Sequence, residues 1–409
     1  MSATITLAEA MQRVLGVPCD PVGVETVALA DALSRHLAHA VATDGPWPST
    51  DRSAMDGFAV AAGSGLAAGT ELPVVGDSLA GHPFAGSLPA GAAIRIMTGA
   101  VVPAGADAVV PVEQTSGFEG SPVVLSAPVQ RGQNIRPIGS EARAGQVVLA
   151  AGCHLRAAEL GALAVLGHHR VEVRQRPLVR VLPTGDEVVP VDQVPLPHQV
   201  RESNSWAIAA QVTAAGGRAE RLPVAPDDAQ ALRACLESAL ADADVLLTIG
   251  GVSKGSHDLV HGTLRELGVA AEFHGIELKP GKPTFFGVRR AARATFVFGL
   301  PGNPASCITV FDLLVRPLLQ RLLGGEPRAW TAQAVLRGSW KPNARLQATP
   351  VRLFVEGAAL AAEVLPPSPS GDPFSLVYGD AYALLPPGSK PGELRVATIV
   401  PYLADGPCA

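Results

Sequence analysis

Three segments in the second half of the chain share one pattern, a short apolar run that ends in a glycine-containing turn. They are residues 179–187, 245–253 and 295–304. Glycine lets the backbone turn tightly and approach a ligand closely. Runs of this kind that alternate with helix-like stretches are typical of an α/β domain with a parallel sheet, where ligands bind beyond the carboxyl ends of the strands. We therefore expect the three turns to converge on one anionic substrate.

Helices are expected where apolar residues recur at helical spacing. This spacing predicts helices over residues 7–15, 27–37, 157–166, 205–215 and 227–241. A further helix is expected after Asn303, a natural N-cap that precedes Pro304, a residue favoured in the first helical turn. Gly324 is a natural stop, and Pro317 is expected to kink the helix. The N-terminus of this helix offers a place for an anion.

The rest of the chain is β-rich, with short apolar runs between Pro and Gly turns. The predicted fold class is therefore multidomain α/β plus β, with four parts. The expected boundaries are 1–20 and 171–326 for a central α/β domain, 21–43 and 145–170 for a small linking α/β region, 44–144 for a β-rich inserted domain, and 327–409 for a C-terminal β domain.

Composition excludes several classes of protein. The net charge is -5 and no block of Lys or Arg occurs, so neither nucleic acid nor an anionic membrane is an expected partner. The five cysteines are scattered and form no C-x-x-C pair, which disfavours a disulfide framework or a zinc site and fits a reducing cytoplasm. No apolar run approaches the roughly 20 residues of a membrane span, and no targeting segment is recognisable.

Two ammonium groups lie three residues apart in the segment Lys279-Pro280-Gly281-Lys282-Pro283. The two prolines stiffen this segment and the glycine turns it, so the lysines form a rigid pair that suits an oxyanion or a phosphate. The alternative is an ordinary exposed loop. The neighbouring glycine turns favour the anion site.

Carboxylates and hydroxyls on the turns offer places for a metal and for phosphate. Asp186 and Glu187 follow a strand and suit Mg²⁺, which prefers carboxylate oxygens and keeps several waters. The alternative is a turn-forming Asp beside a surface Glu. The loop after Gly250 offers backbone N–H groups and the Ser253 hydroxyl as donors, although it lacks the spacing of a Walker motif. Asp258 fits either a ligand contact or a charge that complements a helix dipole.

Seven short motifs occur in a specific order along most of the chain. They are S-A-M-D-G-F-A at 53–59, I-R-I-M-T-G-A at 94–100, G-Q-N-I-R at 132–136, T-G-D-E at 184–187, G-G-V-S at 250–253, K-P-G-K-P at 279–283 and G-L-P-G-N-P-A-S at 299–306. Each is weak alone, but as a set they are highly specific. The chain resembles the MoeA family of molybdopterin molybdenumtransferases, to which the E domain of gephyrin is also similar.

The resemblance implies an enzyme that inserts molybdate into adenylylated molybdopterin, with Mg²⁺-dependent release of AMP. It implies a molybdopterin-binding role for the α/β domain and a homodimer in which the β-rich insert of one subunit faces the α/β domain of the other. It also implies transient contact with molybdopterin adenylyltransferase. As substrates it implies adenylylated molybdopterin and molybdate, and as cofactor Mg²⁺.

The resemblance also assigns site residues. The acidic positions, as Mg²⁺ ligands or organisers of the adenylate linkage, are Asp56, Glu187 and Asp258. The catalytic cations are Lys279 and Lys282, which match molybdate and phosphate contacts. The substrate-binding residues are Ser53, Thr98, Gly99, Thr184, Gly250, Gly251, Ser253, Pro301, Gly302, Asn303 and Ser306, of which Ser306 matches a molybdate or phosphate contact and Gly250, Gly251 and Ser253 would seat the pterin or its phosphate.

Some positions depart from the family pattern. Ser140 and Glu141 stand where Glu and Asp are usual, Glu202 stands for an Asp, and Phe58 stands for a Tyr. The roles of Glu141 and Glu202 stay open, and so do those of Arg345 and Ser370 as extra oxyanion contacts.

Two other functions fit parts of the chain. One is molybdopterin adenylyltransferase, which shares the α/β domain but lacks the two β parts. The other is a carrier or scaffold that binds molybdopterin without chemistry. Retention of the carboxylates and lysines favours the enzyme, because a scaffold can keep its fold without them.

Overall fold

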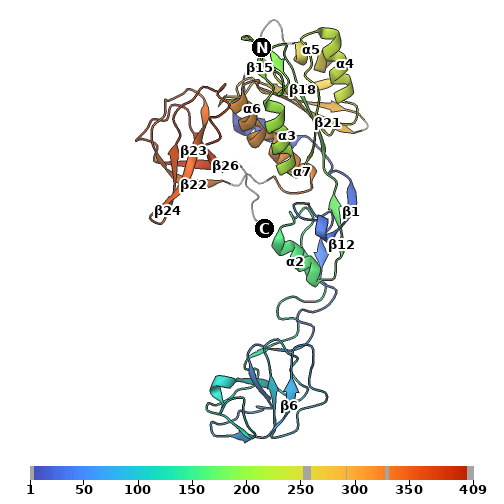
Figure 1. Cartoon of the computed structure of the whole chain (residues 1–409), viewed down its shortest axis with the longest axis vertical. Helices are drawn as coiled ribbons and strands as arrows, with labels where there is room; N and C mark the ends of the chain where they lie inside the picture. The colour runs from blue at the N-terminus through green and yellow to red at the C-terminus, as the bar shows by residue number, and fades with distance from the viewer. Residues whose placement is uncertain (1–3, 252–258, 292, 328–330, 403–409) are drawn as a thin grey trace. The chain divides into compact units, whose positions relative to one another are not determined.

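The chain folds into two compact units (Figure 1). The computed structural model describes residues 4–251, 259–291, 293–327 and 331–402. Unit 1 comprises Met1–His39, Ala151–Leu160 and His169–Ala409, and unit 2 comprises Ala40–Ala150 and Gly161–His168. No helix among the described residues combines the length and the apolar character that a bilayer span needs.

A six-stranded sheet lies at the centre of unit 1. Its order is β16-β13-β17-β21-β20-β18, with bounds Arg218–Arg221, Leu178–Pro183, Val245–Ile249, Ala294–Leu300, Phe285–Arg290 and Val269–His274. The first four strands are parallel, whereas β20 and β18 run antiparallel to their neighbours. The sheet is therefore mixed and not wholly parallel as expected. Only three residues join β20 to β21, which is enough for an antiparallel hairpin but too short for a parallel crossover.

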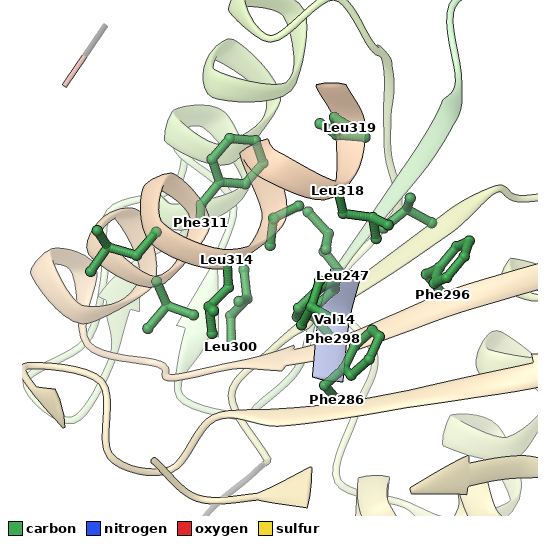
Figure 2. Packing of buried hydrophobic residues seen from close by; sticks show 14 of the residues in the cluster. Val14, Leu247, Phe286, Phe296, Phe298, Leu300, Phe311, Leu314, Leu318 and Leu319 are labelled. Atoms are coloured by element: carbon green, nitrogen blue, oxygen red, sulfur yellow. The ribbon is translucent and has the colours of Figure 1, made fainter. Parts of the chain in front are cut away.

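Helices cover both faces of this sheet, because alternate strand residues are apolar on both sides. One face packs against α1 (Leu7–Gly16), α3 (Asn204–Ala214) and the helical run after Pro304. Figure 2 shows this core, in which Phe311, Leu314 and Leu318 of that run lie over Leu247, Phe298 and Leu300 of the strands. The other face packs against α4 (Ala229–Ala239) and α5 (Leu259–Glu266).

Most of the expected helices are present. Helices α1, α2 (Ala157–Val165), α3 and α4 lie within two residues of the predicted ranges at both ends, and Thr6 and Asp228 cap α1 and α4. The helix expected over 27–37 is wrong. The structure has strand β1 (Val24–Ala28) followed by a single 3₁₀ turn, η1 (Leu29–Asp31), because β1 pairs along its length with β12 (Arg170–Arg174).

The helix after Asn303 changes its winding midway. It begins as α6 (Pro304–Val310), passes through a π-helical turn, η3 (Phe311–Val315), and ends as α7 (Arg316–Leu322). The irregularity ends two residues before Pro317, which has no N–H to donate to the preceding turn. The expected kink is thus a π-helical turn, and the chain leaves the helix at Gly324, whose φ is +78°.

A small barrel follows the central domain. Its strands are β22 (Ala332–Arg337), β23 (Leu346–Glu356), β24 (Ala359–Val364), β25 (Ala381–Leu385) and β26 (Val396–Pro401). The barrel closes because β25 pairs with both β26 and β23. Strand β19 (Leu278–Lys279) of the central domain adds to the edge of β23. The C-terminal β domain expected after residue 327 therefore shares strand pairing with the α/β domain.

Unit 2 is β-rich, as expected. A sheet of order β6-β7-β4-β8 forms its core, with bounds Val74–Ser78, Ala93–Ile96, Gly57–Val60 and Ala108–Pro111. Short ladders surround it: β2 (Val41–Ala42) with β11 (Val147–Leu149), β3 (Arg52–Ser53) with β10 (Ile135–Arg136), and β5 (Glu71–Leu72) with β9 (Val123–Val124), and a 3₁₀ turn, η2 (Val112–Gln114), follows β8.

Candidate functional site

The three glycine turns meet at one edge of the central sheet. Strands β13, β17 and β21 are parallel neighbours, so their carboxyl ends lie side by side. The Thr184 N–H donates to the Ile249 carbonyl (2.9 Å), and the Gly250 N–H donates to the Leu300 carbonyl (3.1 Å). These bonds hold the turns together just beyond the strand ends. The convergence predicted from the sequence is therefore present.

Glycine is required where the turns approach one another. Gly250 and Gly251 both have positive φ, +87° and +64°. A Cβ on Gly251 would lie 2.4 Å from Cγ2 of Val260, and one on Gly250 would lie 3.0 Å from the carbonyl oxygen of Thr184 on the neighbouring turn. Gly251 and Gly302 are exposed, so the backbone is accessible at these two glycines. Ser253 and Asp258, which follow Gly251, lie outside the described residues.

The two lysines flank a tightly held turn. Lys279 ends β19, and the Lys282 carbonyl accepts a hydrogen bond from the Ile276 N–H (3.0 Å). Between them, Gly281 has φ +119°, and its carbonyl accepts a hydrogen bond from the Thr284 hydroxyl (2.6 Å). Both lysine side chains are exposed while Gly281 is buried. Hydrogen bonds hold the backbone of this segment, and both charged side chains are open to solvent.

Both lysines line a cavity of 480 Å³. Its walls come from the 279–283 turn, from Pro301 and the start of α6, and from the C-terminal barrel. Four cationic side chains line it, and none of the described lining residues is acidic. The cations are Lys279, Lys282, Lys341 and Arg345. Such a cavity attracts an anion, because every formal charge along its walls is positive.

Hydroxyl and amide groups complete the lining. Ser306, buried at the start of α6, and Thr309 come from the helix, and Gln347 comes from β23. Asn303 occupies the N-cap position of α6, as expected. Its side chain, however, makes no capping hydrogen bond to the helix. Instead its Nδ2 donates to the Ser370 hydroxyl (2.9 Å), which fixes the segment after β24 against the helix.

The structure brings Arg345 and Ser370 to the cavity, where the sequence left their roles open. Arg345 is oriented by a hydrogen bond from its Nη1 to the Leu278 carbonyl (2.8 Å). Lys341 was not predicted from the sequence, because it belongs to no motif. It lies in the barrel, about sixty positions beyond the lysine pair. Only the pairing of β19 with β23 brings the two segments together.

Two side chains of the T-G-D-E turn make hydrogen bonds to the backbone of neighbouring segments. The Thr184 hydroxyl donates to the Ile249 carbonyl (3.2 Å), and Asp186 accepts from the Asp227 N–H (3.1 Å). Both therefore stabilise turns. The Glu187 side chain is exposed. The Asp186 side chain is exposed as well, so both adjacent carboxylates are open to solvent.

Unit 2 brings together four predicted site residues from two motifs. The Thr98 N–H and hydroxyl both donate to Asp56 Oδ1, at 2.6 and 2.7 Å. The Gly99 N–H donates to the Ser53 carbonyl (2.8 Å), and the Ser53 hydroxyl donates to the Met55 carbonyl (2.6 Å). The hydrogen bonds from the Thr98 hydroxyl and backbone lower the pKa of Asp56, whose side chain is exposed. Asp56 is therefore an oriented, ionised carboxylate.

The G-Q-N-I-R motif supports this cluster. Strand β10 pairs with β3, and the Asn134 carbonyl accepts from the Ala54 N–H (2.9 Å). Arg52, which the sequence analysis did not single out, donates from Nη1 to the Gly99 carbonyl (3.0 Å).

Three departures from the family pattern have structural explanations. Glu202 is buried and accepts from the Ser205 N–H (2.7 Å) at the start of α3, and Arg221 lies beside it. Glu141 forms an ion pair with Arg136. Phe58 is fully buried in the core of unit 2, where a Tyr hydroxyl would need a partner. The contacts of all three residues are structural.

Among the described residues, no group of three or more His, Cys, Asp or Glu side chains is placed to hold a metal ion. Of the three acidic positions, Asp56 belongs to unit 2, Glu187 belongs to unit 1, and Asp258 is not described. The carboxylates still fit Mg²⁺ chemically, since this ion commonly takes one or two carboxylates together with water and substrate phosphates.

Comparison with known proteins agrees with this geometry. Residues 5–167 match the family described as MoeA N-terminal region (domain I and II), and residues 180–321 match a probable molybdopterin binding domain. The chain is 34% identical to the molybdopterin molybdenumtransferase of Bacillus subtilis over 375 residues, which is 90% of this chain and 86% of the relative. It is 36% identical to that of Haemophilus influenzae over 78% of each chain.

A solved structure has the same fold. The molybdopterin biosynthesis moea protein from Pyrococcus horikosii is 31% identical, with a TM-score of 0.78 over 98% of this chain and 99% of that chain. The sequence match, the fold and the order of the motifs agree. The chain therefore belongs to the MoeA family of molybdopterin molybdenumtransferases, which are transferases of molybdenum cofactor biosynthesis.

Proposed function

We propose that this enzyme inserts molybdate into adenylylated molybdopterin and releases AMP in a Mg²⁺-dependent reaction. The observation that carries the proposal is the cavity with Lys279, Lys282, Lys341 and Arg345 on its walls and no acidic side chain among its described lining residues. Molybdate is a dianion of four oxygens, and such a cavity neutralises its charge while offering several donors. Family membership supports the choice of this oxyanion.

In this proposal the cavity residues bind and orient molybdate. Lys279 and Lys282 supply the charge from one rigid turn, and the Ser306 hydroxyl donates from the start of α6. Arg345 faces the ion from the barrel side, already oriented by the Leu278 carbonyl. Fixed donors of this kind stabilise developing negative charge without reorganising during the reaction.

The organic substrate would lie along the edge of the central sheet. Gly251 and Gly302 are exposed there and Gly250 is partly exposed. Thr184, Pro301 and Asn303 lie on the same group of turns. Ser253 is assigned to the same substrate by the family motif. The positive cavity and the open edge share the turn at Pro301 and Asn303, so an oxyanion and a pterin can be held near one another.

Asp56, Glu187 and Asp258 are proposed to hold Mg²⁺, with Ser53, Thr98 and Gly99 supporting Asp56 and contributing to substrate binding. When bound, Mg²⁺ withdraws charge from the phosphate whose bond is cleaved. Thr98 lowers the pKa of Asp56 and fixes its Oδ1, while the side chain stays exposed to a ligand. Glu187 contributes a second exposed carboxylate.

We further propose a cytoplasmic homodimer that meets molybdopterin adenylyltransferase transiently. The support is family membership, together with the scattered cysteines, which form no C-x-x-C pair and fit a reducing compartment.

The test is turnover of adenylylated molybdopterin by the purified protein with Mg²⁺, with and without molybdate. We expect AMP release that depends on molybdate, together with molybdenum in the pterin product. Tight pterin binding without AMP release would instead support the carrier function.

A further inference from the structure

Asp312 is a buried carboxylate beside the cavity, and none of the roles proposed above involves it. It lies in the π-helical turn η3, three residues after the cavity-lining Thr309. Its side chain is only 1% exposed. Burying an ionisable group is costly unless other groups compensate. A π-helical turn is also an uncommon element that occurs often near functional sites.

Three side chains from three elements donate to this carboxylate. Gln211 Nε2, from α3, donates to Oδ1 (2.8 Å), and Tyr382, from β25, donates its hydroxyl to Oδ2 (3.2 Å). Arg316 Nη2, from α7, also donates to Oδ1 and to the Tyr402 carbonyl. Burial nevertheless raises the pKa of Asp312 to about 6. The cluster joins the helical layer of the central domain to the last two strands of the barrel.

The same cluster reaches two walls of the cavity. Tyr382 is the direct cross-strand partner of Pro350 on β23, and Pro350 lines the cavity. The Thr309 side chain is a further hydrogen-bonding neighbour of the Tyr382 hydroxyl. Strand β23 begins at Leu346, directly after Arg345. Asp312 is therefore linked, through Tyr382, to the strand that directly follows Arg345.

We propose that Asp312 is a positioning residue for the oxyanion cavity: it fixes the barrel wall that carries Arg345 against the α6 wall that carries Ser306. The inference rests on the proposed function, because it takes molybdate as the occupant of the cavity. Buried ion pairs often add little to stability, and fixing one arrangement among several is their best-supported use. The contacts of Asp312 with both walls of the cavity fit that use.

The test is the affinity of the full-length protein for molybdate alone, measured by titration calorimetry beside the melting temperature. In Asp312→Asn we expect binding to weaken by about tenfold or more, the usual effect of removing a group that orients a ligand-binding residue. Removal of a negative charge near the cavity would by itself strengthen anion binding. The positioning role and a simple charge effect therefore predict opposite directions.

Asp244→Asn is the matched control. Asp244 is also a buried carboxylate paired with an arginine, Arg293, but it precedes β17 at the opposite end of the strands from the glycine turns. This variant should lose stability and keep its affinity for molybdate. In turnover, Asp312→Asn should raise the KM for molybdate much more than it lowers kcat.

The outcomes separate the two proposals. If wild-type protein does not bind molybdate, the assignment of the cavity is wrong, and the inference fails with it. If wild type binds and Asp312→Asn binds equally well, only the positioning role is refuted. Should Asp312→Asn fail to fold, Tyr382→Phe removes one donor and keeps the ring, and unchanged affinity in that variant would equally refute the inference.

Discussion

Gly281→Ala tests whether the turn between Lys279 and Lys282 needs a glycine. Gly281 has φ +119°, where a side chain is strained, and a non-glycine residue in such a conformation costs about 1–3 kcal/mol. A Cβ there would also lie 2.7 Å from Cγ2 of Val310 and 3.3 Å from Cδ2 of Leu278, both fully buried. Overpacking of this kind adds about 1–3 kcal/mol. We therefore expect about 2–6 kcal/mol of lost stability.

Gly268→Ala supplies the comparison within the same unit. Gly268 has φ +85°, but a Cβ there would meet nothing within 4 Å, so only the backbone strain applies. Urea unfolding of both variants should show Gly281→Ala as less stable by about 1–3 kcal/mol. Because the strain displaces Lys279 and Lys282, molybdate affinity should also fall by about tenfold or more in Gly281→Ala alone. Equal stability losses, or an unchanged affinity in Gly281→Ala, would show that a glycine at position 281 is not what holds the two lysines in place.

Three further predictions concern single side chains. Lys282→Ala should weaken molybdate binding by at least about tenfold in calorimetry, because a charged donor to an oxyanion contributes about 1.5–3 kcal/mol and about 1.4 kcal/mol is tenfold in affinity. Lys390→Ala, which removes an exposed cation that does not line the cavity, should leave the affinity unchanged. Thr98→Val removes one of the hydrogen bonds that lower the pKa of Asp56, so the acid limb of the pH profile for AMP release should move to higher pH, while Thr98→Ser should leave it in place. Glu202→Ala should lower the free energy of unfolding by about 1–3 kcal/mol in urea, because it removes the buried acceptor at the start of α3; an unchanged midpoint would contradict the structural role assigned to Glu202.

Local patterns predicted much of the central domain. The turns at 184, 250 and 301 were recognisable because each ends an apolar run with glycine, and a parallel arrangement then places them at one edge. The family expected from the ordered motifs is confirmed. The helix predicted over 27–37 failed for a tertiary reason, since β1 forms by pairing with β12, more than 140 residues later.

The far wall of the cavity could not be predicted from local patterns. Lys341 and Gln347 belong to the barrel, and they reach the lysine turn only because β19 pairs with β23. Asn303 has the sequence of a helix cap, yet its side chain donates to Ser370, which is 67 residues away. Such contacts depend on the packing of domains and leave no trace in the spacing of neighbouring residues.

The most direct test of the account is the position of bound molybdate. Crystals of the protein soaked in molybdate should give an anomalous scattering peak at the molybdenum edge inside the cavity, within hydrogen-bonding distance of Lys279, Lys282 and Ser306. A peak at another place on the molecule, with the cavity unchanged, would contradict the assignment of this cavity as the oxyanion site.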